Sequence, residues 1–339
     1  MTGRGLGRRE RAVWAAIVTV LTLCGMGSAA WAAAAVTVGS VTCDPATVAD
    51  DGSFSLSCRV AAPAPTPTAS ASPSVTPPPT MPPPPTTPGP MLNCLAAPSR
   101  CGFPDASNTG PSGNLVTWVG SRSFTTAGQV VSDTVISGCV EVRAANVTFR
   151  NVQINANGCF WGVRQFSTNA QFVDSAITCG GFNGTAFGSS SITLTRVEIT
   201  RCENGLDVDG GILVQDSWIH DMNGSQGGAH TDGAQLNRGA TDVTFRHNTI
   251  NMGPGPGATG AVMIWNEGDP QARRVSVDGN LLAWGTYTIY CGRMGVVDNI
   301  RITNNRFGPA EFGHANACDN GEVWSGNVRD SDGQPLAAA

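Results

Sequence analysis

Val147-Thr-Phe-Arg-Asn-Val-Gln-Ile154 recurs, with substitutions, as Val243-Thr-Phe-Arg-His-Asn-Thr-Ile250 and Ile300-Arg-Ile-Thr-Asn-Asn-Arg-Phe307. Apolar and polar residues alternate within each copy, which is the side-chain period of a β-strand. Eight segments share the order apolar, x, apolar, x, x, Asn/Ser-like, x, apolar. They begin at Val147, Ala170, Ile192, Ile212, Val243, Val275, Ile300 and Glu322.

The spacing of these segments indicates the architecture. Their sixth positions lie 23, 22, 20, 31, 32, 25 and 22 residues apart. A coil of this length is typical of a parallel β-helix, whose strands stack ~4.8 Å apart, so that like residues lie above like residues. Leucine-rich repeats need a dense leucine framework, which is missing, and a β-sandwich has no reason to recur this regularly. We therefore predict an all-β fold, a parallel β-helix of about 8–10 coils.

One column of this repeat predicts a detail of the interior. Asn248, Asn280, Asn305 and Asn327 all occupy the sixth position. Stacked in successive coils, they would form an internal amide ladder that satisfies the backbone at a bend.

The N-terminus has the pattern of a secretory signal peptide over residues 1–32. Four arginines up to Arg11 precede the apolar stretch Ala12–Cys24, and Ala30-Trp31-Ala32 supplies a small-x-small cleavage site. The apolar stretch is too short to span a bilayer. We expect a secreted, extracellular protein with no membrane span.

Composition excludes several classes of function. All 20 basic residues are arginines, so mechanisms that need a lysine base, Schiff base or P-loop lysine are excluded. The formal net charge of −5 becomes −8 when the signal peptide, with four arginines and one glutamate, is removed. Nucleic acid is not an expected partner of such an acidic chain. We expect a monomer.

Ten of the 11 cysteines remain after the signal peptide, an even number in an exported protein. No short Cys-x-x-Cys or Cys/His spacing suggests zinc. Sequence leaves the connectivity open, and proximity suggests Cys43–Cys58, Cys94–Cys101, Cys139–Cys159, Cys179–Cys202 and Cys291–Cys318.

Three zones follow the signal peptide. Residues 33–60 hold two alternating runs and predict a small β segment stapled by a disulfide. Residues 61–90 contain thirteen prolines among Ala, Ser and Thr, which predicts an extended linker. Residues 91–339 form the predicted β-helix domain.

A second strand precedes the repeated segment in each coil and carries the candidate site. Alignment on its glycines points Leu206, Val208, Ala234 and Leu236 inward. The outward face then combines carboxylates, amides, arginine and aromatic rings, as sugar-binding sites do. A solvated parallel sheet would also need polar residues here, so a merely structural ladder stays open. The candidate substrate-binding residues are Asp209, Gln235, Asn237, Trp265, Glu267, Tyr290 and Arg293, together with Arg164.

The longest departures from the coil period flank His230-Thr-Asp-Gly-Ala-Gln235, and insertions in a solenoid usually build its functional wall. Asp207 and Asp232 would lie on neighbouring coils about three residues apart, with Cα atoms ~11 Å from each other. Their carboxyl groups suit an inverting glycosidase, and His230 would position one of them.

Two alternatives use the same residues. Asp207, Asp209 and Asp232 could share a calcium ion through hard oxygen ligands. Calcium would then acidify a uronate, and Arg164 or Arg293 would be the base of a lyase. The spacing decides nothing between these options.

Beyond the repeat columns, two stretches carry a resemblance to a known group. Cys101-Gly-Phe-Pro-Asp-Ala-Ser-Asn-Thr-Gly110 and Cys139-Val-Glu-Val-Arg-Ala-Ala-Asn-Val-Thr-Phe-Arg-Asn151 resemble exported actinobacterial proteins of the pectin-lyase-like superfamily. The resemblance spans roughly residues 91–335 and implies a right-handed β-helix. Activity varies within that superfamily.

The resemblance also limits the chemistry. Thr231-Asp232-Gly233 is similar to part of a polygalacturonase motif, but His230 and Gln235 replace its asparagine and second aspartate. The later signatures of polygalacturonases are absent, and the missing lysine excludes the lysine-dependent lyases. We expect a secreted polysaccharide lyase or glycoside hydrolase acting around Asp207, Asp232 and His230. The alternatives are a non-catalytic carbohydrate- or cell-surface-binding module and a structural envelope protein.

Overall fold

The computed structural model divides the chain into two units, Met1–Pro83 and Pro84–Ala339. It describes five short strands of the first unit and, in the second, residues 93–339 except 182–183, 224–229, 256, 265–271 and 293–297. The predicted signal peptide and the linker over 61–90 lie outside the described residues.

The first unit contains two small antiparallel sheets. β1 (Val36–Val38), β2 (Val41–Cys43) and β5 (Cys58–Val60) form one, and β3 (Thr47–Val48) pairs with β4 (Phe54–Ser55) in the other. Cys43 is the register partner of Cys58. Their side chains lie outside the described part of the chain, so this disulfide stays a prediction.

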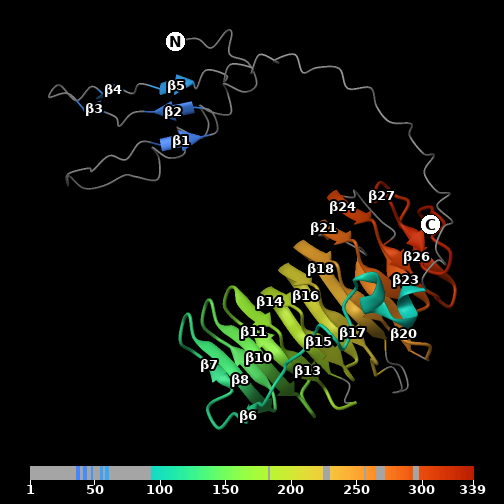
Figure 1. Cartoon of the computed structure of the whole chain (residues 1–339), viewed down its shortest axis with the longest axis horizontal. Coiled ribbons are helices and arrows are strands. Elements are labelled where there is room, and N and C mark those ends of the chain that lie inside the picture. Colours follow the sequence, from blue (N-terminus) through green and yellow to red (C-terminus); the bar gives the residue numbers. More distant parts are fainter. Residues whose placement is uncertain are drawn as a thin grey trace, which may run out of the picture. The chain divides into compact units, whose positions relative to one another are not determined.

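The second unit is a right-handed parallel β-helix, as predicted (Figure 1). Successive strands turn around one long core and pair in parallel with the strands of the coils before and after. The strands form three ladders. We name them the site sheet, which contains the predicted site; the repeat sheet, which contains the start of each repeated segment; and the strap sheet, named after the segment 93–112 described below.

The site sheet consists of nine described strands, which agrees with the predicted number of coils. They are β7 (Ser123–Phe124), β9 (Val140–Val142), β11 (Trp161–Gln165), the first half of β14 (Thr185–Thr195), of β16 (Asn204–Gln215) and of β18 (Thr231–Arg246), β20 (Ala258–Ile264), β23 (Tyr287–Tyr290) and β26 (Gly313–Asn316).

The repeat sheet contains the first part of each repeated segment. Its strands are the first half of β8 (Val130–Ser137) and of β10 (Thr148–Asn155), β12 (Ala170–Val173), the second halves of β14, β16 and β18, β21 (Arg273–Asp278), β24 (Asp298–Thr303) and β27 (Val323–Ser325).

The strap sheet contains the remainder of each segment. Its strands are β6 (Val116–Thr117), the second halves of β8 and β10, β13 (Ala176–Thr178), β15 (Glu198–Thr200), β17 (Trp218–His220), β19 (Thr249–Asn251), β22 (Leu281–Ala283), β25 (Arg306–Phe307) and β28 (Val328–Arg329).

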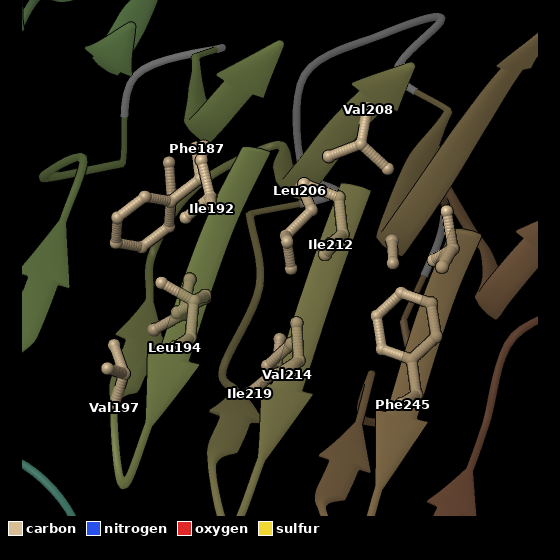
Figure 2. Packing of buried hydrophobic residues seen from close by; sticks show 14 of the residues in the cluster. Phe187, Ile192, Leu194, Val197, Leu206, Val208, Ile212, Val214, Ile219 and Phe245 are labelled. Carbon is tan, nitrogen blue, oxygen red and sulfur yellow. The ribbon is translucent and has the colours of Figure 1, made fainter. Parts of the chain in front are cut away.

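The register of the repeat sheet confirms the sequence repeat. Phe149 pairs with Phe172 and Phe172 with Leu194, as the third positions of consecutive segments. The rings of Phe149 and Phe172 stack with centroids 4.5 Å apart. Figure 2 shows the same stacking further along, where side chains from successive coils, such as Ile192 and Ile212, fill one continuous interior. The core is thus a set of columns of like residues.

The predicted asparagine ladder is present and fully buried. The Asn248 N–H donates to Asn280 Oδ1 at 2.8 Å, and the pattern repeats from Asn280 to Asn305 and from Asn305 to Asn327. In earlier coils a serine replaces the amide, as where Ser217 Oγ accepts the Val197 N–H. The ladder therefore satisfies backbone groups at the bend between the repeat and strap sheets.

The residue just before each ladder position is in the left-handed region. Asn151, Asp174, Asp216 and Asn304 have φ between 48° and 57°. Short polar side chains tolerate this conformation better than most. The bend is therefore sharp enough to turn the chain between two sheets within one residue.

A segment that we call the strap, residues 93–112, contains the 3-10 helices η1 (Cys94–Ala96) and η2 (Pro98–Cys101). At one end, the Cys94 and Leu95 N–H groups donate to the buried carboxylate of Asp330. At the other, the Gly110 N–H donates to the Arg196 carbonyl. The strap thus links the last coil to the early ones before the first coil begins.

Four of the five predicted disulfides are present: Cys94–Cys101, Cys139–Cys159, Cys179–Cys202 and Cys291–Cys318. Their Cα–Cα separations of 4.8–5.6 Å are normal for this bond. Among the described residues, no helix has the length and apolar character to cross a membrane.

Candidate functional site

One outward-facing column runs along the site sheet through the predicted site. Register pairing joins its members from coil to coil: Glu141, Arg164, Gly188, Asp207, Gln235, Met263, Tyr290 and Asn316. The structure therefore brings Arg164, Asp207, Gln235 and Tyr290 onto one line, as predicted for this face.

Asp207 lies between two side chains that point into the core. Leu206 and Val208 are fully buried, and Figure 2 shows both in the interior. The alternation of the strand therefore turns Asp207 to the outside, where it is half-buried, with one carboxylate oxygen that no described group hydrogen-bonds. Burial raises the pKa of Asp207, the Asn237 side chain opposes the rise, and the charge of Asp209 adds to it.

Asp209 is exposed two residues further along the same strand. Its Oδ1 accepts a hydrogen bond from the Asn237 amide at 3.2 Å, as expected if Asn237 follows Asp209 in the next coil. Asn237 therefore interacts with both carboxylates of the predicted face.

Asp232 lies on the neighbouring coil and is fully buried. It precedes Gln235, the register partner of Asp207, by three residues, which confirms the predicted offset. Neither of its carboxylate oxygens has a hydrogen-bond partner among the described residues. Burial raises the pKa of Asp232 well above its usual value, the Gly260 N–H opposes this, and the charges of Glu203 and Asp207 increase it. Burial therefore favours the protonated, uncharged form of Asp232.

Sequence reasoning missed two neighbours of Asp232. Glu203 adds to the rise in its pKa, and Asn204 Oδ1 accepts the Asp232 N–H at 2.9 Å. Asn204 is the first residue of β16 and Glu203 directly precedes it. Polar residues at the start of this strand were therefore the signal that could have found them.

Of the remaining predicted residues, the structure describes His230 and Tyr290. His230 is exposed immediately before β18, and the Tyr290 hydroxyl hydrogen-bonds Thr286 Oγ1. Trp265, Glu267 and Arg293 lie outside the described residues. Within the described part of the chain, no group of three His, Cys, Asp or Glu side chains could hold a metal ion. Asp207, Asp209 and Asp232 are all described, so the structure does not bring them together as the predicted calcium ligands.

Two coils before Asp207 lies a cluster of which the sequence singled out only Arg164. We call Phe160, Trp161, Arg164 and Phe166 the arginine–aromatic platform. Phe160 and Phe166 are 67% and 45% exposed, which is unusual for phenylalanine. The Arg164 guanidinium lies 4.9 Å from the centroid of Phe166 and 5.8 Å from that of Trp161. The cluster is an exposed surface on which ring faces and a cation occur together.

Gly188 and a disulfide hold the platform in place. A Cβ on Gly188 would overlap the indole of Trp161, so the ring lies against that glycine, which is the column neighbour of Asp207. Cys159, which directly precedes Phe160, is buried and bonded to Cys139. The platform therefore borders the carboxylates and is fixed from two sides.

Comparison of the chain with protein-family models, curated proteins and solved structures found no match. The all-β fold and its long parallel sheet agree with the resemblance to the pectin-lyase-like superfamily. Membership of that superfamily stays a prediction.

Proposed function

We propose that this protein is a secreted polysaccharide-cleaving enzyme, a glycoside hydrolase in which Asp207 is the proton donor. The observation that carries the proposal is the raised pKa of Asp207 beside the exposed carboxylate of Asp209. A carboxyl group of raised pKa with a second carboxylate nearby is a usual arrangement for a general acid. A carbohydrate-binding module would have no use for the raised pKa of Asp207.

The geometry of the pair suits inversion. Asp207 and Asp209 lie two residues apart on one strand, so their side chains leave the same face with Cα atoms ~6.6 Å apart, and in this proposal their carboxyl groups lie at a similar distance. Carboxyl groups of inverting glycosidases lie ~6.5–9.5 Å apart, because a water molecule must fit beside the sugar. Asp207 would protonate the glycosidic oxygen as its bond to the anomeric carbon breaks. Asp209 would take a proton from the water that attacks that carbon.

In this proposal Asp232 has a supporting part. Because it is fully buried, it does not contact a substrate in this conformation. Burial favours its protonated form, which would keep a further negative charge out of a site that already contains Asp209 and Glu203. His230 and Tyr290 would contact the polymer on the C-terminal side of Asp207.

The test is to incubate the purified protein with a panel of plant and bacterial polysaccharides, with calcium and with chelator. Reducing ends and ultraviolet-absorbing unsaturated products are followed together. We expect reducing ends without unsaturation, with activity lost as the pH rises through the raised pKa of Asp207. Asp207→Asn and Asp209→Asn should each lower the rate at least 100-fold. Asp319→Asn, at an exposed position far along the chain, is the matched control.

Other outcomes would replace the proposal. Unsaturated products that chelator abolishes would establish a calcium lyase. Binding without any cleavage would favour the carbohydrate-binding module instead. A rate unchanged in both aspartate variants would exclude these residues as the acid–base pair.

A further inference from the structure

We propose that the arginine–aromatic platform is a binding subsite for an anionic sugar unit, and that it selects acidic over neutral polysaccharides. This inference rests on the proposed function and names its substrate class. It starts from Arg164, whose guanidinium forms no salt bridge with any residue that the structure describes.

Arg164 forms no salt bridge with any described residue, although Glu141 is its register partner. Glu141 instead pairs with Arg143 at 2.8 Å, and the Arg143 guanidinium lies 4.3 Å from the centroid of the Phe166 ring. Two guanidinium groups therefore lie at one phenylalanine ring, and one of them lacks a carboxylate. An exposed arginine in this position has its donors available to a ligand.

Stacking on aromatic rings also orients that arginine. A guanidinium over a ring is held by cation–π attraction, so fewer rotamers are lost when it binds. Its planar fork of donors matches the two oxygens of a carboxylate, and it binds other oxyanions similarly. Phe160 and Trp161, with ring centroids 5.2 Å apart, add apolar faces of the kind on which sugar rings stack. A charged, ring-shaped ligand such as an acidic sugar fits both features.

The position of the platform links it to the proposed chemistry. Arg164, Gly188 and Asp207 are consecutive members of one column, so Arg164 lies two coils, or ~10 Å, from Asp207. A polysaccharide lying along the column would place one unit on the platform while a nearby linkage meets Asp207. The mature chain is acidic, so a cation-bearing surface here is a local exception that favours an anionic polymer.

The experiment measures binding rather than cleavage. Asp207→Asn is used as the background, and its affinity for a polyuronate, a sulfate-ester galactan and an uncharged galactan of matched length is determined by calorimetry. We expect the anionic glycans to bind at least tenfold more tightly than the neutral one, with affinity falling as salt is added. Preference for the polyuronate identifies a carboxylate and preference for the sulfated polymer a sulfate ester; either supports the subsite.

Variants assign the preference to the platform. Arg164→Gln should remove most of the tenfold preference, and Arg164→Lys should retain only part, because a lysine cannot present a planar fork. Gly188→Ala should weaken binding of every glycan by displacing Trp161. Arg150→Gln removes an exposed arginine of the repeat sheet and should change nothing. Near-identical melting temperatures would show that the variants fold.

The proposal is overturned if Arg164→Gln binds the anionic glycans as tightly as its background, or if Arg150→Gln weakens binding equally. Equal affinity for the neutral galactan would also overturn it. Its failure is distinguishable from failure of the proposed hydrolase. Arg164-dependent binding without cleavage by the unmodified protein would retain the subsite and discard the hydrolase. Cleavage at an unchanged rate in Arg164→Gln would retain the hydrolase and discard the subsite.

Discussion

Asn280→Ala should be among the most destabilising single substitutions in the β-helix domain. The Asn280 side chain is fully buried and makes four hydrogen bonds. Its Oδ1 accepts from the N–H and the amide of Asn248 at 2.8 and 2.9 Å. Its Nδ2 donates to the Phe245 carbonyl at 3.1 Å and to Asn305 Oδ1 at 2.9 Å.

The magnitude follows from the groups that lose their partners. Alanine leaves the Asn248 N–H and the Phe245 carbonyl without these hydrogen bonds in the interior. An unsatisfied buried polar group costs about 1–3 kcal/mol, so the two backbone groups alone account for about 2–6 kcal/mol. At about 2–4 °C per kcal/mol for a domain of this size, the central value of ~4 kcal/mol lowers the melting temperature by about 8–16 °C.

The assay is thermal and urea unfolding of the disulfide-intact protein, followed by circular dichroism. Asn114→Ala is the matched control, because Asn114 is exposed and its side chain forms no hydrogen bond with a described residue. We expect this control to stay within ~0.5 kcal/mol of the parent. If Asn280→Ala were equally harmless, the amide ladder would not be what stabilises the bend.

Three further predictions concern charges and cross-links. Burial raises the folded-state pKa of Asp232, so the stability that its protonation contributes is complete below the unfolded pKa of about 4 and is lost as the pH rises through the folded pKa. Asp232→Asn should therefore flatten the fall in unfolding free energy with pH, measured by urea unfolding between pH 4 and 8. Asp330→Ala removes the acceptor of two strap N–H groups and the partner of Arg306, so proteolysis within the strap should accelerate severalfold while the asparagine ladder stays protected in hydrogen exchange. Replacing both Cys179 and Cys202 by alanine opens a 23-residue loop and should lower the unfolding free energy by ~3 kcal/mol in denaturant titrations, and a loss below ~1 kcal/mol would contradict the loop-entropy estimate.

Parts of the fold that depend on a period could be predicted from the sequence, because a solenoid stacks like residues. The columns of Phe149 and of Asn248 follow directly from the spacing of the segments. Four cysteine pairs also followed, since their partners lie close in the chain: three pairs join neighbouring coils, and Cys94–Cys101 lies within the strap. The strap could not be predicted in this way, because its partner, Asp330, lies 236 residues from Cys94 and outside any repeat.

The candidate site was predictable in its register but not in its environment. Alternation along β16 places Asp207 outward and opposite Gln235, as the glycine alignment indicated. Burial of Asp232 depends on what covers it in three dimensions, and no local pattern encodes that. The platform was not predicted for a similar reason. Simple alternation would point Trp161 and Phe166 to opposite faces of the sheet, and what joins the two rings in the structure is the Arg164 guanidinium, which lies over both.

The strap also bears on how the chain is synthesised. Its anchor, Asp330, is translated 236 residues after Cys94, which at about 5–20 residues per second is a delay of roughly 10–50 s. During that interval coils can stack behind one another, yet the strap has nothing at its far end to bind. While the chain is still on the ribosome, the Cys94 end of the strap would therefore stay unbound until nearly the whole domain has emerged. The strap is the first part of the domain to be translated. Its binding to Asp330 is nevertheless expected to be among the last steps of folding.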